Sequence, residues 1–310
     1  MRPIVARPTA ASPTRAMIAA LRARLGAADP APPRIALPPV VAPPARVYAP
    51  RRAPLTPGAT AAHTTALLGI GHVGTRYATD VVLQFQAELA VAHEAVAAEL
   101  DDGWAKDHGF LPLQTRVADH REYLLRPDLG RRLAPASLAE LTARATRGVD
   151  VQLILADGLS ARACMESGPA LYHATATALV ARGLTVGIPV CARFARVWLE
   201  DEIGAVVGAK VAIILLGERP GLGTGDGLSA YLVHAPAVGK TDGDRNMMSN
   251  LHARGTPPAE AAPRLAALAH AMIRQGVSGV GLDLDQVDAV LERGYRAPQV
   301  RQRLVERGPR

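Results

Sequence analysis

The segment Gly217–Gly221, with the sequence GERPG, has residue types that suit ligand binding. It directly follows an apolar run, Val211–Leu216, that is typical of a buried strand. Ligands of open α/β sheets bind beyond the carboxyl ends of the strands. Glu218 and Arg219 in this turn would meet a polar ligand there. Alternatively, they pair with each other or face solvent.

Asp157 and Gly158 follow another apolar run, Val151–Ala156, and so occupy an equivalent position. Asp157 either faces a ligand or caps the helix that follows it. A further polar segment, Asp244–Asn250 (DRNMMSN), lies in a long connection of a kind that is often functional. Its adjacent Met247 and Met248 suit a flat apolar ligand, although core filling is the commoner use of such residues.

The segment Gly69–Gly74 spells GxGxxG, which is the glycine pattern of dinucleotide-binding loops. That site also needs a carboxylate at the end of a second strand about 20 residues later. The acids in that range, Glu88 and Glu94, fall inside a helical pattern instead. The glycines therefore favour a tight turn over a nucleotide site.

No self-contained catalytic constellation is present in the sequence. The nine histidines show neither HxxxH nor HExxH spacing, and the two cysteines, Cys164 and Cys191, form no CxxC. We therefore predict no catalytic residue and no metal site in this chain. This pattern favours a subunit that holds a cofactor or a partner.

Short apolar strands alternate with helices after residue 150, which is typical of a doubly wound α/β sheet. The predicted strands are Val151–Ala156, Val186–Val190, Val211–Leu216, Ser229–Val233 and the short candidate Gly279–Leu284. The predicted helices in this part are Ser160–Arg182, Asp201–Gly208 and Ala266–Gln275.

The N-terminal part has a different composition. Residues 1–60 contain 13 of the 25 prolines and predict a disordered tail, rich in Pro, Ala and Arg. Within the tail, Thr14–Leu25 has the periodicity of a short amphipathic helix, which would dock on a shell or partner protein. Alternatively, this segment is an alanine-rich stretch that only looks periodic. Residues 61–147 predict a smaller, mainly helical domain, with a helix over Thr79–Leu100 and a loop at Phe110–Pro112.

The formal charge of +7 belongs to the tail, because residues 1–60 carry about +8 and the rest is near neutral. The folded body thus lacks the basic surplus of a nucleic-acid-binding domain. No apolar stretch reaches the length of a membrane span. We predict a cytoplasmic protein that binds neither nucleic acid nor membrane.

Several segments, in the same order as in the family, resemble the light (small) subunit of ethanolamine ammonia-lyase. They are YLLRPDLGRRL at 123–133, DGLS at 157–160, RVWLEDEIG at 196–204, GAKVAIILLGERPGLG at 208–223, DRNMMSN at 244–250 and GTPP at 255–258. The resemblance spans about residues 65–283, and RPDLGRRL followed by GERPGLG is its most specific part. The tail and the extension at 284–310 lie outside it.

The resemblance implies a subunit of an adenosylcobalamin-dependent lyase that converts ethanolamine to acetaldehyde and ammonia by a radical mechanism. It implies a Rossmann-like domain at 148–283 that holds cobalamin against the barrel of a large subunit, which carries the substrate. Val197, Glu218 and Met247 match the family's cobalamin contacts. The implied assembly has six copies of each chain and, in some bacteria, sits inside a microcompartment.

Two positions depart from the family pattern. Met247 stands where cysteine is usual, and His72 stands where arginine is common. Two alternatives therefore remain open. One is a diverged structural subunit that pairs with the large chain but binds cobalamin poorly. The other is an independent nucleotide-binding α/β protein that uses the glycine loop.

Overall fold

The computed structural model describes residues 20, 23, 72–100, 102–222 and 225–287. The helices and strands named below belong to the unit Ala49–Arg310. The predicted tail, nearly all of the Thr14–Leu25 segment and most of the 284–310 extension lie outside the described residues. Among the helices that are described, none is both long and apolar enough to cross a membrane.

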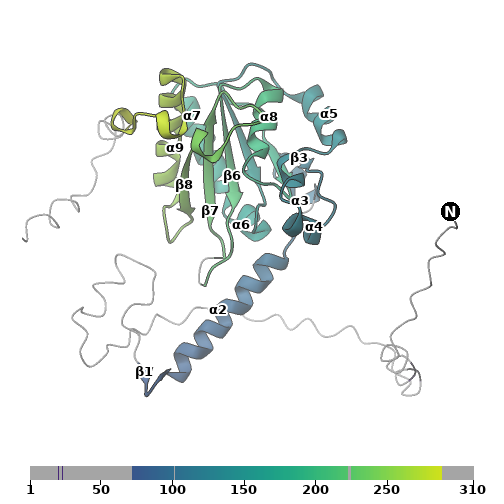
Figure 1. The fold of residues 1–310 in the computed structure, drawn as a ribbon, viewed down its shortest axis with the longest axis vertical. Helices are drawn as coiled ribbons and strands as arrows, with labels where there is room; N and C mark the ends of the chain where they lie inside the picture. Colours follow the sequence, from purple (N-terminus) through teal and green to yellow (C-terminus); the bar gives the residue numbers. More distant parts are fainter. Residues whose placement is uncertain (1–19, 21–22, 24–71, 101, 223–224, 288–310) are drawn as a thin grey trace, which may run out of the picture. The chain divides into compact units, whose positions relative to one another are not determined.

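A six-stranded sheet, in the order β3-β5-β4-β6-β7-β8, forms the centre of the fold (Figure 1). The first four strands in this order are mutually parallel, whereas β7 and β8 run antiparallel to their neighbours. The strands are β3 (Leu111–Gln114), β4 (Val151–Ala156), β5 (Val190–Arg193), β6 (Val211–Gly217), β7 (Leu228–His234) and β8 (Arg245–Leu251). The predicted α/β class is confirmed, with a mostly parallel sheet.

Helices cover both faces of the sheet (Figure 1). One face packs against α6 (Ala161–Glu166), α7 (Gly168–Ala181) and α9 (Pro258–Gln275). The other packs against α5 (Pro135–Arg144) and α8 (Leu199–Val207). The remaining elements are β1 (His72–Val73), β2 (Arg76–Tyr77), α2 (Thr79–Ala97), α3 (Asp102–Asp107), α4 (His120–Leu125), η1 (Leu129–Arg131), η2 (Asp242–Asp244) and η3 (Gly279–Gly281).

The apolar strands divide their side chains between two cores. In β4, Leu153 and Leu155 join the α7–α9 core, while Ile154 and Ala156 join the α5–α8 core. All of them are fully buried. Because side chains alternate across a strand, a strand buried on both faces is largely apolar, and the buried polar Gln152 of β4 donates to the carbonyl oxygens of Leu153 and Ile188. This explains why the runs VQLILA and VAIILL were recognisable in the sequence.

Two sequence predictions at the β3 edge are corrected. The predicted loop at Phe110–Pro112 contains the start of β3, an edge strand in which Pro112 is tolerated because one side of the strand has no partner strand. The strand predicted at Val186–Val190 begins regular pairing only at Val190. Val186 forms an isolated bridge, and Pro189 has no N–H to donate to the sheet.

Three further corrections concern segments that follow β4 in the chain. The candidate strand at Gly279–Leu284 contains the 3-10 turn η3, which Gly279 enters with a left-handed φ of +70°. The polar connection at Asp244–Asn250 contains most of β8, which is half-exposed at the sheet edge and so needs no continuous apolar run. The predicted helix Ser160–Arg182 is two helices, α6 and α7, separated at Ser167.

The sheet draws on residues from both sides of the domain boundary predicted near residue 148. β3 comes from the segment that was expected to be mainly helical, and it pairs in parallel with β5. The rest of that segment supplies α2, α3, α4, η1 and α5.

A buried ionic cluster joins the start of α8 to the start of β8. The Arg245 guanidinium lies 2.6 Å from Glu200 Oε1 and 3.1 Å from Asp201 Oδ2, and all three side chains are at most 3% exposed. One cation faces two carboxyl groups, so a single ionised carboxylate balances its charge. Burial raises the pKa of Glu200 to about 8, which exceeds the opposing effect of Arg245.

We predict that Glu200→Gln changes the free energy of unfolding at pH 7 by less than about 1 kcal/mol, whereas Arg245→Met lowers it by about 3–5 kcal/mol. The folded wild-type chain binds more protons at Glu200 than the unfolded chain between pH 4.5 and 8. Its stability should therefore fall as the pH rises through this range, and Glu200→Gln should reduce that slope. Urea unfolding at several pH values measures both effects. If the unfolding free energy depended on pH equally in wild type and Glu200→Gln, the raised pKa assigned to Glu200 would be contradicted.

Candidate functional site

The carboxyl ends of β4 and β6 touch backbone to backbone. Gly158 has φ of +55°, and a Cβ at this position would lie 2.3 Å from the Gly217 carbonyl oxygen. A Cβ on Gly217 would lie 2.2 Å from the Asp157 carbonyl oxygen. The Leu159 N–H donates to the Gly217 carbonyl at 2.9 Å. Only glycine permits this approach, and it brings the two polar turns of the sequence analysis side by side.

Asp157 ties the end of β5 to the same place. Its carboxylate accepts hydrogen bonds from the backbone N–H of Phe194 at 2.7 Å and of Ala195 at 3.1 Å. Phe194 adopts a left-handed conformation with φ of 56°. Burial raises the pKa of Asp157 to about 6, and these backbone donors oppose the rise. The helix cap is Ser160, whose Oγ accepts from the Ala163 N–H at 3.1 Å, so neither interpretation of Asp157 from sequence was right.

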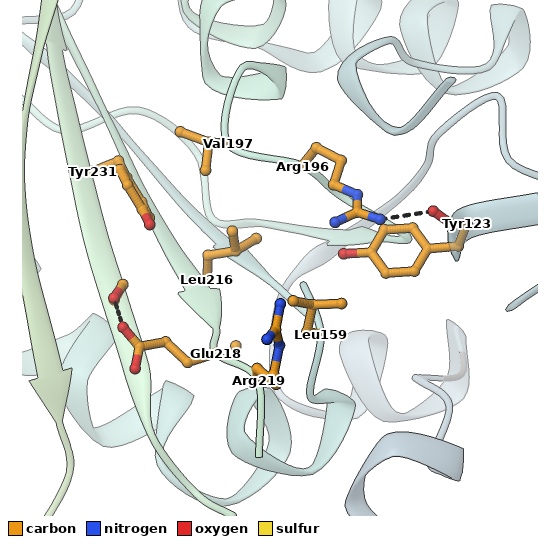
Figure 2. Close-up of a pocket in the computed structure, with 10 residues that line it drawn as sticks. Tyr123, Leu159, Arg196, Val197, Leu216, Glu218, Arg219 and Tyr231 are labelled. Atoms are coloured by element: carbon orange, nitrogen blue, oxygen red, sulfur yellow. Dashed lines mark hydrogen bonds between the residues drawn. The ribbon is translucent and has the colours of Figure 1, made fainter. Parts of the chain in front are cut away.

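A pocket of about 370 Å³ opens at these strand ends (Figure 2). Figure 2 shows Glu218 and Tyr231 on one side, Arg196 and Tyr123 on the other, and Leu216 between them. The lining residues are Tyr123, Leu159, Arg196, Val197, Leu216, Gly217, Glu218, Arg219, Ser229 and Tyr231. The position agrees with the general rule for ligand sites in α/β sheets.

Glu218 is half-buried in this pocket, and its carboxylate is held by a hydrogen bond from the neighbouring strand. The Ser229 hydroxyl of β7 donates to Glu218 Oε1. Burial raises the pKa of Glu218, while His252 and the Asn250 amide lower it. The carboxylate thus has a fixed position and faces the pocket as a hydrogen-bond acceptor.

Arg196 is fixed on the opposite side of the pocket. Its guanidinium lies over the Tyr123 ring, 4.0 Å from the ring centre, and Nη2 donates to the Tyr123 carbonyl oxygen at 2.8 Å. A Cβ on Gly130 would lie 2.8 Å from Arg196 Cγ. The YLLRPDLGRRL segment therefore forms the wall against which the Arg196 side chain packs.

The three residues predicted as cobalamin contacts lie near one end of one sheet face. Val197 and Glu218 both line the pocket. Met247 is not among the lining residues, but it pairs directly with the pocket residue Tyr231 across β7 and β8. Directly paired residues project to the same face, so Met247 extends the pocket wall, with 56% of its surface exposed.

The glycine loop is not part of this site. Gly69, Ile70 and Gly71 lie outside the described residues, and His72–Tyr77 form the antiparallel hairpin β1–β2. The two-stranded sheet of this hairpin is separate from the six-stranded sheet. The His72 ring lies 4.7 Å from the Tyr77 ring. A dinucleotide loop instead connects a strand of the main sheet to a helix.

Comparison with known families agrees with these segments. The sequence model of the ethanolamine ammonia-lyase light chain matches residues 58–283. The chain belongs to this family. As an ethanolamine ammonia-lyase light chain it is a subunit of a lyase, and the term light chain implies a large partner subunit. In the part of the chain that the structure describes, no group of three or more His, Cys, Asp or Glu side chains could hold a metal ion.

Sequence reasoning missed Ser229, Tyr231 and Tyr123 as parts of the site. Ser229 and Tyr231 are two residues apart on β7, so their side chains lie on the same face of the sheet. This spacing could already be seen in the predicted strand at 229–233. Tyr123 lay within a family segment but is distant in sequence from the other residues of the pocket. Only the fold shows that its ring supports Arg196.

We predict that Gly158→Ala lowers the free energy of unfolding by about 3 kcal/mol or more. The new Cβ would overlap the end of β6, and alanine would also have to adopt a strained left-handed conformation. Gly148→Ala is the matched control. Gly148 also has a positive φ, of +73°, but no atom lies within 4 Å of the position that a Cβ would take there. The control should lose only about 1 kcal/mol. Denaturant unfolding measures both, and equal losses would argue against close packing of the strand ends.

Proposed function

We propose that this light chain holds adenosylcobalamin against the large subunit of ethanolamine ammonia-lyase. The observation that carries the proposal is the fixed Glu218 carboxylate in a pocket at the strand ends, on the same sheet side as Val197 and Met247. The assembled enzyme converts ethanolamine to acetaldehyde and ammonia. The substrate site lies on the large subunit, and this chain supplies no catalytic residue.

The chemistry of the site fits the rim of a corrin ring. Corrin side chains end in amides, whose N–H groups need acceptors. A carboxylate has about four acceptor positions, so the bond from Ser229 leaves Glu218 able to accept more. The exposed Met247 and the half-exposed Val197 offer apolar surface beside it. Glu218 would bind and orient the amide edge, while the apolar side chains would exclude water from it.

The size of the pocket favours a shared site. About 370 Å³ is enough for the edge of a corrin but far too small to enclose a cobalamin. The large subunit would therefore cover most of the cofactor. Bound adenosylcobalamin supplies the radical chemistry, and the protein supplies its position and surroundings.

The wider assembly follows the family. We propose six copies of each chain in a cytoplasmic hetero-oligomer, in some hosts inside a microcompartment. The segment Thr14–Leu25 would then dock on the shell. The Rossmann-like domain at 148–283 and the helical domain at 61–147 would be the cofactor-holding and supporting parts.

The alternative of a diverged structural subunit depends on Met247 replacing cysteine. Methionine keeps a soft, apolar side chain that packs against flat ligands, although it has no thiol. Because Met247 is exposed beside the pocket, its greater bulk meets no crowded core. These properties favour retained cobalamin binding.

The central test uses both chains, co-expressed and co-purified. The wild-type complex should bind one cobalamin per chain pair and release acetaldehyde from ethanolamine. Glu218→Ala should weaken cobalamin binding about tenfold to a hundredfold, as expected for a lost hydrogen bond to a charged group. Equilibrium dialysis with absorbance detection measures the dissociation constant. Glu260→Ala, on the exposed surface of α9, is the control and should bind like wild type.

A stable complex that binds no cobalamin would overturn the proposed function in favour of a structural subunit. Unchanged binding by Glu218→Ala would refute only the role of Glu218.

We also predict that Met247→Cys changes the cobalamin dissociation constant of the complex by less than about threefold, because either side chain supplies apolar contact. Met247→Asp should weaken binding at least tenfold, since it would bring an unpaired charge against the corrin. The same dialysis measures both variants. A large gain of binding by Met247→Cys would show that the wild-type chain has lost a thiol-specific contact.

A further inference from the structure

Arg196 is a partly buried cation on the pocket wall that no carboxylate of the described residues neutralises. Nearby arginines differ in this respect. Arg193, at the end of β5, forms an ion pair with Glu99, and Arg132 pairs with Glu202 at 3.4 Å. A cation that is removed from water without a counter-charge is costly. The partner of Arg196 therefore lies outside the described residues.

The Arg196 guanidinium has one terminal nitrogen left for such a partner. Nη2 is used by the Tyr123 carbonyl oxygen at 2.8 Å, and Nε is buried without an acceptor. Nη1 forms no hydrogen bond within the part of the chain that the structure describes. In Figure 2 the nitrogen opposite the bond to Tyr123 turns toward Leu216 and the pocket.

The fold holds this guanidinium in place before any ligand binds. The Arg196 backbone N–H donates to the Gly130 carbonyl at 2.8 Å, which fixes the start of the side chain. The Tyr123 ring under the guanidinium is itself fixed, because its hydroxyl donates to the Ala195 carbonyl at 3.0 Å. A donor that is already ordered loses little freedom on binding, as is typical of a binding residue.

The charges of the molecules in the proposed reaction limit what Arg196 can bind. Near neutral pH, ethanolamine and ammonia are cations, and acetaldehyde is uncharged. The amide side chains and the adenosyl group of adenosylcobalamin are also uncharged. The phosphodiester of the nucleotide tail is the anionic group of this cofactor, and a guanidinium matches phosphate oxygens in both charge and shape.

We propose that Arg196 binds the phosphodiester of the cobalamin nucleotide tail. This inference rests on the proposed function, in which Glu218 accepts hydrogen bonds from the corrin amides. A fixed acceptor and a fixed cation then face each other across the pocket and orient the edge of the cofactor. Arg219 also lines the pocket, but it is exposed and no hydrogen bond among the described residues holds its side chain.

The test compares two corrinoids that differ only in a phosphate, adenosylcobinamide and adenosylcobinamide phosphate. The wild-type large–light complex should bind the phosphate form at least about tenfold more tightly, as expected for a charge-assisted hydrogen bond. In Arg196→Gln this preference should fall below about threefold, and adenosylcobalamin itself should bind about tenfold to a hundredfold more weakly than in wild type. Equilibrium dialysis measures all of these dissociation constants.

Arg144→Gln is the matched control. Arg144 pairs with Glu140 at 3.2 Å and lies near the start of β3 and β5, at the opposite end of the strands. This variant should keep the wild-type preference for the phosphate form. A purely structural role of Arg196 would weaken the binding of both cobinamides equally in Arg196→Gln. That result would overturn the inference and leave the proposed function intact.

Arg196→Lys is a second variant in case Arg196→Gln fails to assemble. It keeps the charge but loses the planar fork, so it should retain part of the preference for the phosphate form. If neither variant co-purified with the large chain, Arg196 would instead be an assembly residue, and the inference would be overturned. A wild-type complex that binds adenosylcobalamin but does not distinguish the two cobinamides would also overturn it. A stable complex that binds no corrinoid would refute the proposed function as well.

Discussion

The contact between Gly158 and Gly217 is the constraint on which the rest of the site depends. It holds the ends of β4 and β6 closer together than any side chain would allow. Asp157, next to Gly158, binds the backbone at the end of β5. Two consecutive residues thus gather three strand ends, and a rigid junction of this kind fixes the positions of the side chains that leave it, Glu218 and Arg196.

A second junction, the ionic cluster around Arg245, ties the antiparallel edge strand β8 to the region of the pocket. Arg245 at the start of β8 is bonded to Glu200 and Asp201 at the start of α8. Val197 lies just before α8, and Met247 lies just after Arg245. The buried Arg245 guanidinium therefore fixes the positions of these two apolar residues relative to each other. Removing Arg245 would leave a buried carboxylate unpaired, which is why such a cluster resists separation once it is formed.

The sequence predicted an element correctly wherever a single physical cause, such as burial on both faces, determined its pattern of residues. Runs such as VAIILL are buried on both faces, so their composition alone predicted strands, and the position of Glu218 after one of them predicted its place at a strand end. β8 was missed because an edge strand with one exposed face carries polar residues such as Asn246 and Ser249. The role of Asp157 depends on backbone groups 37 and 38 residues away, which no local spacing encodes.

The two sides of the pocket differ in how firmly the fold holds them, and this difference bears on a shared cofactor site. Glu218 is bonded to Ser229 on β7, and Arg196 is bonded to Tyr123 on α4, before any ligand arrives. Met247, in contrast, is largely exposed at the edge of the sheet. Pre-formed polar groups reduce the ordering cost of binding, while an exposed flexible methionine adapts to whatever surface covers it. A chain that contributes one half of an interface needs this combination, because the partner completes the apolar side of the site.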